Sequence, residues 1–149
     1  MTITVFVLFL SCSQVIEDSF NSSELISSKG EKIYINSLNW GISNDYQITA
    51  ISSKKDKVQE RSDTEDIING LEPFFYSFKN DSLTLFFKDT VTYKVNENFK
   101  TIIISYKTLN SDQYNSIRQK AYMNDGYRSI PERREVAYPD NMPKPPLTE

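Results

Sequence analysis

The side chains that could do chemistry in this sequence are carboxylates, hydroxyls, amines and one thiol. The 149 residues include 20 Asp and Glu, 17 Lys and Arg, one Cys and no His. Without His, catalytic triads with an imidazole base and most catalytic zinc sites are excluded. A single Cys forms neither an internal disulfide nor a redox pair. The formal net charge is −3, so the chain has no excess of basic residues to bind phosphates, and we expect no nucleic-acid partner.

Three arrangements of these side chains come close to known catalytic or metal-binding patterns. The run Ser52–Lys55 fits the SxxK spacing of penicillin-binding enzymes, but the SDN and KTG elements that complete their site are missing. Asp63, Glu65 and Asp66 offer oxygen ligands for calcium without the Gly and distal Glu of an EF-hand loop. Two facing carboxylates hydrolyse glycosides without His, but the sequence singles out no such pair. We therefore predict no catalytic residue, no metal site and no cofactor.

The aromatic side chains point to binding rather than to catalysis. Phe, Tyr and Trp make up 13% of the chain. Most of them should lie in the core, because each buries about 150–250 Å². The exceptions should be aromatic residues on turns or on the less apolar faces of strands. These form a predicted surface for a ligand or partner, made of Trp40, Tyr46, Phe75 and Phe86.

The N-terminal residues have the pattern of a secretory signal that ends at the single Cys. Residues 1–11 are mostly apolar and carry no charged side chain. They are too short to cross a bilayer as a helix, which needs about 20 apolar residues. The small residue Ser11 precedes Cys12, as at a signal cleavage site. The basic residues that usually open a signal are missing before Val5, so we expect the true start to lie upstream.

The segment Leu8–Cys12 resembles the lipobox of bacterial lipoproteins. The resemblance implies that the signal is cut before Cys12 and that this residue carries the lipid. It also implies a place in the cell envelope, and Ser13 directly after the Cys implies sorting to the outer membrane. Residues 12–30 are rich in Ser, Asn and acids, so we expect a flexible tether between the lipid and the folded domain.

Residues 31–126 have the sequence pattern of a single, mainly β domain. Short runs alternate between apolar and polar residues and are separated by turn residues. Asn80 and Asp81 suit a tight hairpin turn, and three consecutive Ile at 102–104 imply a strand covered on both faces. The sequence predicts an antiparallel β-sheet or sandwich whose strands lie over 32–38, 46–52, 73–79, 82–88, 91–95 and 101–106.

One helix should follow the last strand and pack on the sheet. Asn110 is its expected N-cap, Gln113 completes a capping box, and Gly126 ends it. Before it, the charged run 53–66 is expected to be a solvated loop that ends in one helical turn over 63–70. Most of the six prolines lie beyond Ile130, so we expect residues 127–149 to form a largely disordered tail.

The segments Trp40–Gln47 and Gly70–Tyr76 make the folded part resemble small uncharacterised lipoproteins of the Bacteroidetes. The resemblance runs from Lys32 to Gly126 and implies an anchored β-rich domain without a known activity. We therefore expect a lipid-anchored, non-catalytic module of the cell envelope that binds a protein or glycan partner. The alternatives are a small envelope enzyme that uses carboxylates, and a periplasmic lipoprotein of the immunity type.

Overall fold

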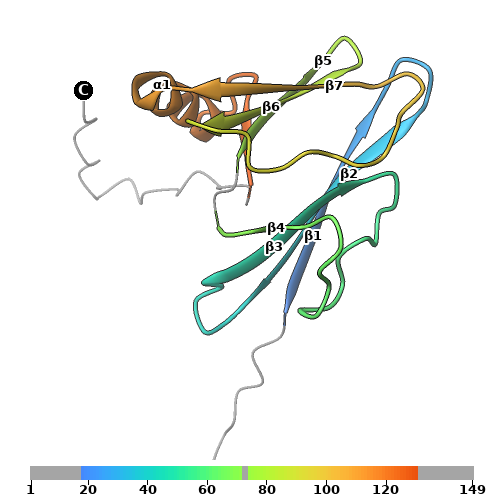
Figure 1. Cartoon of the computed structure of the whole chain (residues 1–149), viewed down its shortest axis with the longest axis vertical. Helices are drawn as coiled ribbons and strands as arrows, with labels where there is room; N and C mark the ends of the chain where they lie inside the picture. Colours follow the sequence, from blue (N-terminus) through green and yellow to red (C-terminus); the bar gives the residue numbers. More distant parts are fainter. Residues whose placement is uncertain (1–17, 72–73, 131–149) are drawn as a thin grey trace, which may run out of the picture.

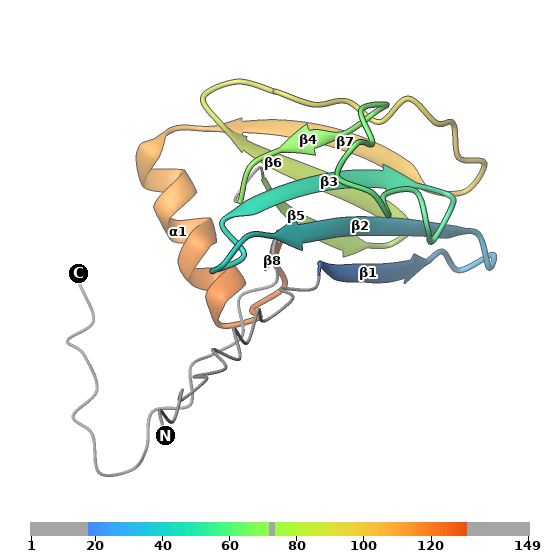
Figure 2. The same cartoon turned by 90° about the horizontal axis from the view of Figure 1, so that it is seen from below.

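The computed structural model describes residues 18–71 and 74–130, which form two four-stranded sheets and one helix (Figure 1). Sheet A contains, in spatial order, β1 (Ser19–Ile26), β2 (Lys32–Trp40), β3 (Tyr46–Ser52) and β4 (Ile68–Asn69). Sheet B contains, in spatial order, β7 (Ile103–Leu109), β6 (Ser82–Lys88), β5 (Phe75–Lys79) and β8 (Arg128–Ser129). The helix, α1 (Ser111–Tyr122), lies at one end of the stacked sheets (Figure 2). The predicted mainly β fold with one packed C-terminal helix is confirmed.

One strand pair departs from the expected antiparallel pattern. β7 runs parallel to β6, with Ser82 opposite Ile103 and Lys88 opposite Leu109. A parallel neighbour requires the chain to return to the opposite end of the sheet. Residues 89–102 make this crossover, so the strand expected over 91–95 is wrong. Tyr93, in its middle, is instead buried against the core between the sheets.

The main core lies between the two sheets and follows from the alternation along each strand. Ile33 and Ile35 of β2 face this core, as does Ile51 of β3. From sheet B, the inward residues include the fully buried Leu83 and Leu85. Both strands of the predicted hairpin form, and its turn residues Asn80 and Asp81 adopt the left-handed angles φ 51 and 58. The observed faces follow the period-two alternation of these strands.

Two covers protect the outer faces of the sheets. The loop between β3 and β4 covers sheet A, because Val58 is completely buried against Leu38, Ile48 and Ala50. The expectation of a solvated loop is therefore wrong at Val58, and its end forms turns and β4 rather than a helical turn. On sheet B, α1 covers only the end near Leu109. Ile103, at the other end of β7, is 67% exposed, so the expected double cover of that strand is also wrong.

The folded domain is longer at both ends than the predicted 31–126. β1 pairs with β2 along its whole length, so the predicted tether over 12–30 is wrong from Ser19 onward. A polar segment is stable here because its backbone hydrogen bonds to β2 and only one face needs apolar cover. At the other end, Ile130 is buried, so residues 127–130 belong to the fold and not to the tail. The predicted signal, Cys12 and the tail beyond Ile130 lie outside the described residues.

A carboxylate in the β1–β2 hairpin joins the two sheets. Glu31 accepts hydrogen bonds from the backbone N–H groups of Lys100 (2.7 Å), Thr101 (2.5 Å) and Ile102 (3.1 Å). It also accepts one from the Thr101 hydroxyl at 2.6 Å. The Thr101 hydroxyl, followed by the backbone N–H groups, lowers the pKa of Glu31 to about 2. This carboxylate fixes the end of the crossover immediately before β7.

A second carboxylate links the same hairpin to the β5–β6 turn. Asp81 accepts hydrogen bonds from the N–H of Ser28 at 2.6 Å and from its hydroxyl at 2.5 Å. Its backbone carbonyl accepts from the N–H of Ile103 at 2.9 Å, at the first residue of β7. The turn residues of one sheet therefore hold the turn residues of the other, next to the start of the parallel strand.

We predict that Glu31→Gln destabilises the protein and flattens its pH dependence. The folded-state pKa of Glu31 lies below its usual 4.5, so its stabilisation is complete above that pH and is lost as the pH falls toward about 2. The amide keeps one acceptor oxygen but carries no charge. Urea unfolding between pH 2 and 7 should show a smaller acid-induced loss for this variant than for the wild type.

The matched control is Glu65→Gln, at an exposed carboxylate in the loop between β3 and β4. This control should keep the wild-type pH profile. Equal slopes for wild type and Glu31→Gln between pH 2 and 5 would show that Glu31 does not provide the acid-sensitive link.

Candidate functional site

Two surfaces at opposite ends of the molecule are candidates for binding. The β2–β3 turn lies at the lower end in Figure 1, beside the start of β1. The junction of β7 and α1 lies at the upper end of the same view. We call Trp40, Ile42 and Tyr46 the sheet A tip, and the depression between β7 and α1 the α1 groove.

The sheet A tip is a stacked aromatic pair closed by a tight turn. Trp40 and Tyr46 lie opposite each other in the β2–β3 register, and their ring centroids are 5.8 Å apart with planes 12° apart. Gly41 has a φ of 99°, and a Cβ there would collide with the Asp45 carboxylate. The turn leaves Ile42 88% exposed and Tyr46 57% exposed. A rigid turn therefore presents apolar side chains to the surroundings.

An ion pair holds the start of the described chain beside this tip. Asp18 accepts hydrogen bonds from the Nε and Nη2 atoms of Arg61, at 2.9 and 2.5 Å. The Arg61 Cζ atom lies 5.9 Å from the centre of the Trp40 ring, a cation–π distance. The hydrogen bond from Arg61 lowers the pKa of Asp18 and keeps it ionised. The residue that precedes β1 is therefore fixed to the end of sheet A that carries the tip.

The four aromatic residues predicted as one surface separate into two pairs, so that prediction is wrong as a single platform. Trp40 and Tyr46 lie together at the tip, as described above. Phe75 and Phe86 are instead buried under α1 on the outer face of sheet B. The Phe75 ring contacts Tyr114 of the helix, with centroids 4.8 Å apart. Alternation identified the outer face correctly, but it could not show that a helix covers it.

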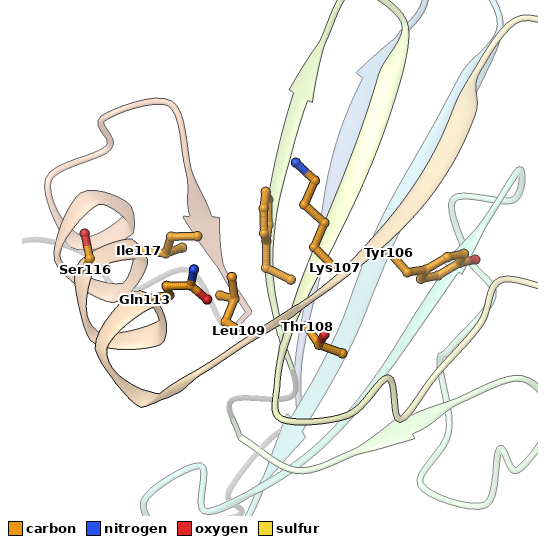
Figure 3. Close-up of a pocket in the computed structure, with 8 residues that line it drawn as sticks. Tyr106, Lys107, Thr108, Leu109, Gln113, Ser116 and Ile117 are labelled. Atoms are coloured by element: carbon orange, nitrogen blue, oxygen red, sulfur yellow. The ribbon is translucent and has the colours of Figure 1, made fainter.

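The α1 groove has a volume of about 610 Å³ and a mixed lining (Figure 3). Its lining residues come from β6, β7 and α1: Phe86, Tyr106, Lys107, Thr108, Leu109, Gln113, Ser116 and Ile117. Figure 3 shows Gln113 and Ile117 facing Leu109, while Tyr106 points away from the helix. The Lys107 ammonium lies 6.0 Å from the centre of the Phe86 ring. The groove therefore combines an apolar floor with hydrogen-bonding groups and one cation.

The wall made by α1 is positioned by its N-cap. The Asn110 side chain accepts a hydrogen bond from the Gln113 N–H at 2.9 Å, and the Gln113 side chain accepts from the Asn110 N–H at 3.1 Å. This confirms the predicted capping box. Leu109 is buried with Tyr114 and Ile117 in the cluster that joins the helix to sheet B. The helix is thus attached directly to the end of β7.

A row of hydroxyl groups continues from the groove along the outer face of sheet B. Ser77, Thr84 and Ser105 lie opposite one another on β5, β6 and β7. The hydroxyls of Thr84 and Ser105 are 2.9 Å apart, and all three residues are half-buried. This row lies on the part of the outer face that α1 leaves uncovered. A ligand in the groove could extend along these donors and acceptors.

The SxxK-like run and the acidic cluster at Asp63 form hydrogen bonds that hold loops in place. The Ser52 hydroxyl donates to Glu97 at 2.5 Å, and the Ser53 N–H donates to the same carboxylate at 2.7 Å. Burial opposes ionisation of Glu97, but these hydrogen bonds outweigh it and lower its pKa. Asp63 accepts from the N–H groups of Gln59 and Glu60 and closes a turn. These groups hold the crossover and the loop between β3 and β4 in place.

The described residues contain neither a clustered metal site nor a membrane-spanning helix. Residues 18–71 and 74–130 contain no group of three or more His, Cys, Asp or Glu side chains arranged to hold a metal ion. In the same ranges, no helix has the length and apolar character needed to cross a bilayer.

Arg61 and Lys107 were not among the predicted site residues. Arg61 belongs to the charged run 53–66, whose composition is typical of a solvated loop. Its contacts with Asp18 and Trp40 join parts of the chain that are distant in sequence. Lys107 belongs to a strand whose last residues were not predicted. The predicted helix start at Asn110 was the available signal, because a helix that folds back on its preceding strand creates a groove at that junction.

No protein-family model, no curated protein and no solved structure matches the chain.

Proposed function

We propose that this chain is a lipid-anchored, non-catalytic binding module of the bacterial cell envelope. Cys12 carries the lipid, in the outer membrane, and the folded domain presents the α1 groove to a protein or glycan partner. The lipobox-like segment Leu8–Cys12 supports the lipid attachment. The observation that carries the proposal further is where the described chain starts, because β1 begins at the lower end of the domain in Figure 1 and the junction of β7 and α1 lies at the upper end.

The spacing between Cys12 and the domain limits where the domain can lie. Residues 13–17 separate Cys12 from Asp18. An extended chain advances roughly 3.3–3.6 Å per residue, so Asp18 lies within about 20 Å of the lipid-bearing residue. The end of sheet A that carries Asp18 is therefore close to the membrane. The α1 groove, at the other end, is directed toward soluble or neighbouring envelope components.

The lining of the groove favours a partner with both apolar and hydrogen-bonding groups. Leu109 and Ile117 provide apolar contact, while Lys107 and Ser116 provide donors on either side. The adjacent hydroxyls of Thr84 and Ser105 extend the polar surface. An extended peptide segment or a glycan chain has this mixture of groups. The carboxylates with lowered pKa values, such as Glu31 and Asp63, act in holding loops, which supports binding as the role of the domain.

We predict that Cys12→Ala moves the protein from the membrane fraction to the soluble fraction. Without the thiol no thioether-linked lipid can form, and the remaining apolar contacts do not hold a domain stably on a bilayer. The protein is expressed from its own gene, and its distribution between the membrane and soluble fractions of the cells is measured. Ser13→Ala keeps the thiol and should remain with the membrane. Equal retention of Cys12→Ala and wild type in membranes would contradict lipid attachment.

We predict that changes in the α1 groove weaken capture of the partner. The wild-type chain is used to isolate partners from an envelope extract, and the captured species is then titrated against variants. Lys107→Glu and Ser116→Trp should each weaken its binding about tenfold, by charge reversal and by filling the groove. Lys94→Glu makes the same charge change on the crossover and should bind normally. Unchanged affinity of both groove variants would exclude this surface.

A further inference from the structure

We propose that the sheet A tip rests on the phospholipid surface and forms a second, non-covalent membrane contact. The proposal rests on the lipid attachment proposed above, because that attachment brings the tip to the membrane. The occupant of this surface is a zwitterionic bilayer interface. The consequence is a fixed orientation of the domain, with the α1 groove directed away from the membrane.

The tip has the residue types that favour a bilayer interface. Ile42 is the most exposed large apolar residue of the described chain at 88%, and Tyr46 stands beside it. Tyr and Trp rings have an apolar body and a polar group, and they are enriched where the acyl chains meet the headgroups. Phe20 adds a partly exposed ring on the same outer face of sheet A, opposite Leu38. Apolar side chains therefore gather where β1 starts.

The tip is already held in one shape before any contact forms. The stacked Trp40 and Tyr46 rings fix its base, and the Gly41 turn fixes the position of Ile42. Arg61 packs over Trp40 and holds Asp18 through two hydrogen bonds. Because these side chains are ordered by one another, docking costs little conformational entropy.

The place where the chain leaves the domain selects the membrane as the occupant. Asp18, which lies within about 20 Å of Cys12, is tied to Arg61, and Arg61 packs over Trp40, so the chain leaves the domain next to the tip. A tether of this length keeps the tip at a high effective concentration near the lipid surface, so a weak contact is well populated. A soluble partner has no comparable advantage at this end of the domain.

The charges near the tip favour a neutral lipid surface. Arg61 and Asp18 neutralise each other in an ion pair. Asp45 is the remaining charged side chain of the β2–β3 turn, and it is acidic. An anionic membrane would repel it, whereas zwitterionic headgroups do not. Phosphatidylcholine vesicles are therefore the matched test surface.

The sequence provides its own probe and its own attachment point for a test. Trp40 is the sole Trp and Cys12 the sole Cys of the chain. The full chain is coupled through Cys12 to a maleimide lipid in phosphatidylcholine vesicles, with or without brominated acyl chains that quench Trp fluorescence. The Trp40 emission should fall by about half in the brominated vesicles, because interfacial Trp rings lie next to the acyl chains. Unquenched Trp40 emission would overturn the proposal.

Matched variants separate docking from mere proximity. Ile42→Asp should remove most of the quenching, whereas Ile103→Asp, the same change at the exposed Ile of β7, should keep it. Moving the probe with Trp40→Phe and Lys107→Trp places it at the α1 groove, because the side chain at 107 lies over the Phe86 ring, and no quenching is expected there. Equal quenching at both probe positions would contradict the orientation. Cooperative urea unfolding of each variant verifies that it is folded.

The outcome is independent of the lipid attachment in cells, because the chemical coupling replaces it. If Trp40 is not quenched in the brominated vesicles but the wild-type protein is membrane-bound in cells, the docking of the tip is rejected and the lipid attachment is retained. If Trp40 is quenched in the vesicles but Cys12→Ala remains in the membrane fraction of cells, the lipid attachment is rejected and the docking of the tip is retained.

Discussion

The hydrogen bonds to one carboxylate, Glu31, determine how the two sheets meet. Its oxygens hold three consecutive N–H groups at the end of the crossover, directly before the parallel strand β7. β7 pairs with β6 on one side and leads without a loop into the cap of α1. The position of the groove wall therefore depends on a contact at the far end of the strand. A charged acceptor suits this task, because hydrogen bonds to an ionised carboxylate are stronger than those between neutral groups.

The covers of the two outer faces divide the surface into protected and accessible regions. Val58 protects the middle of sheet A, and α1 protects Phe75 and Phe86 on sheet B. Two regions stay uncovered: the sheet A tip at one end, and the α1 groove with its hydroxyl row at the other. We propose that these two regions have different roles, the tip in contact with the membrane and the groove in contact with the partner.

Local sequence signals predicted the elements that are stabilised by their own residues. The alternation over Tyr46–Ser52 and Ser82–Lys88 and the capping box at Asn110 all gave the observed elements. β1 was missed because its stability comes from backbone pairing with β2 rather than from its polar side chains. The parallel register was missed because Glu31 and the crossover set it over a long sequence distance. Among the candidate site residues, Trp40 and Tyr46 are six positions apart in the sequence, whereas Arg61 reaches Trp40 only in the folded chain.

We propose that Cys12 joins this domain to the membrane and so gives its two ends separate roles. Peptide mass spectrometry of the protein isolated from the membranes of its own cells tests this attachment. We expect an N-terminal peptide that starts at Cys12 and carries a diacylglycerol on its sulfur. A peptide that runs unbroken through Ser11 and Cys12, with a free thiol, would contradict it.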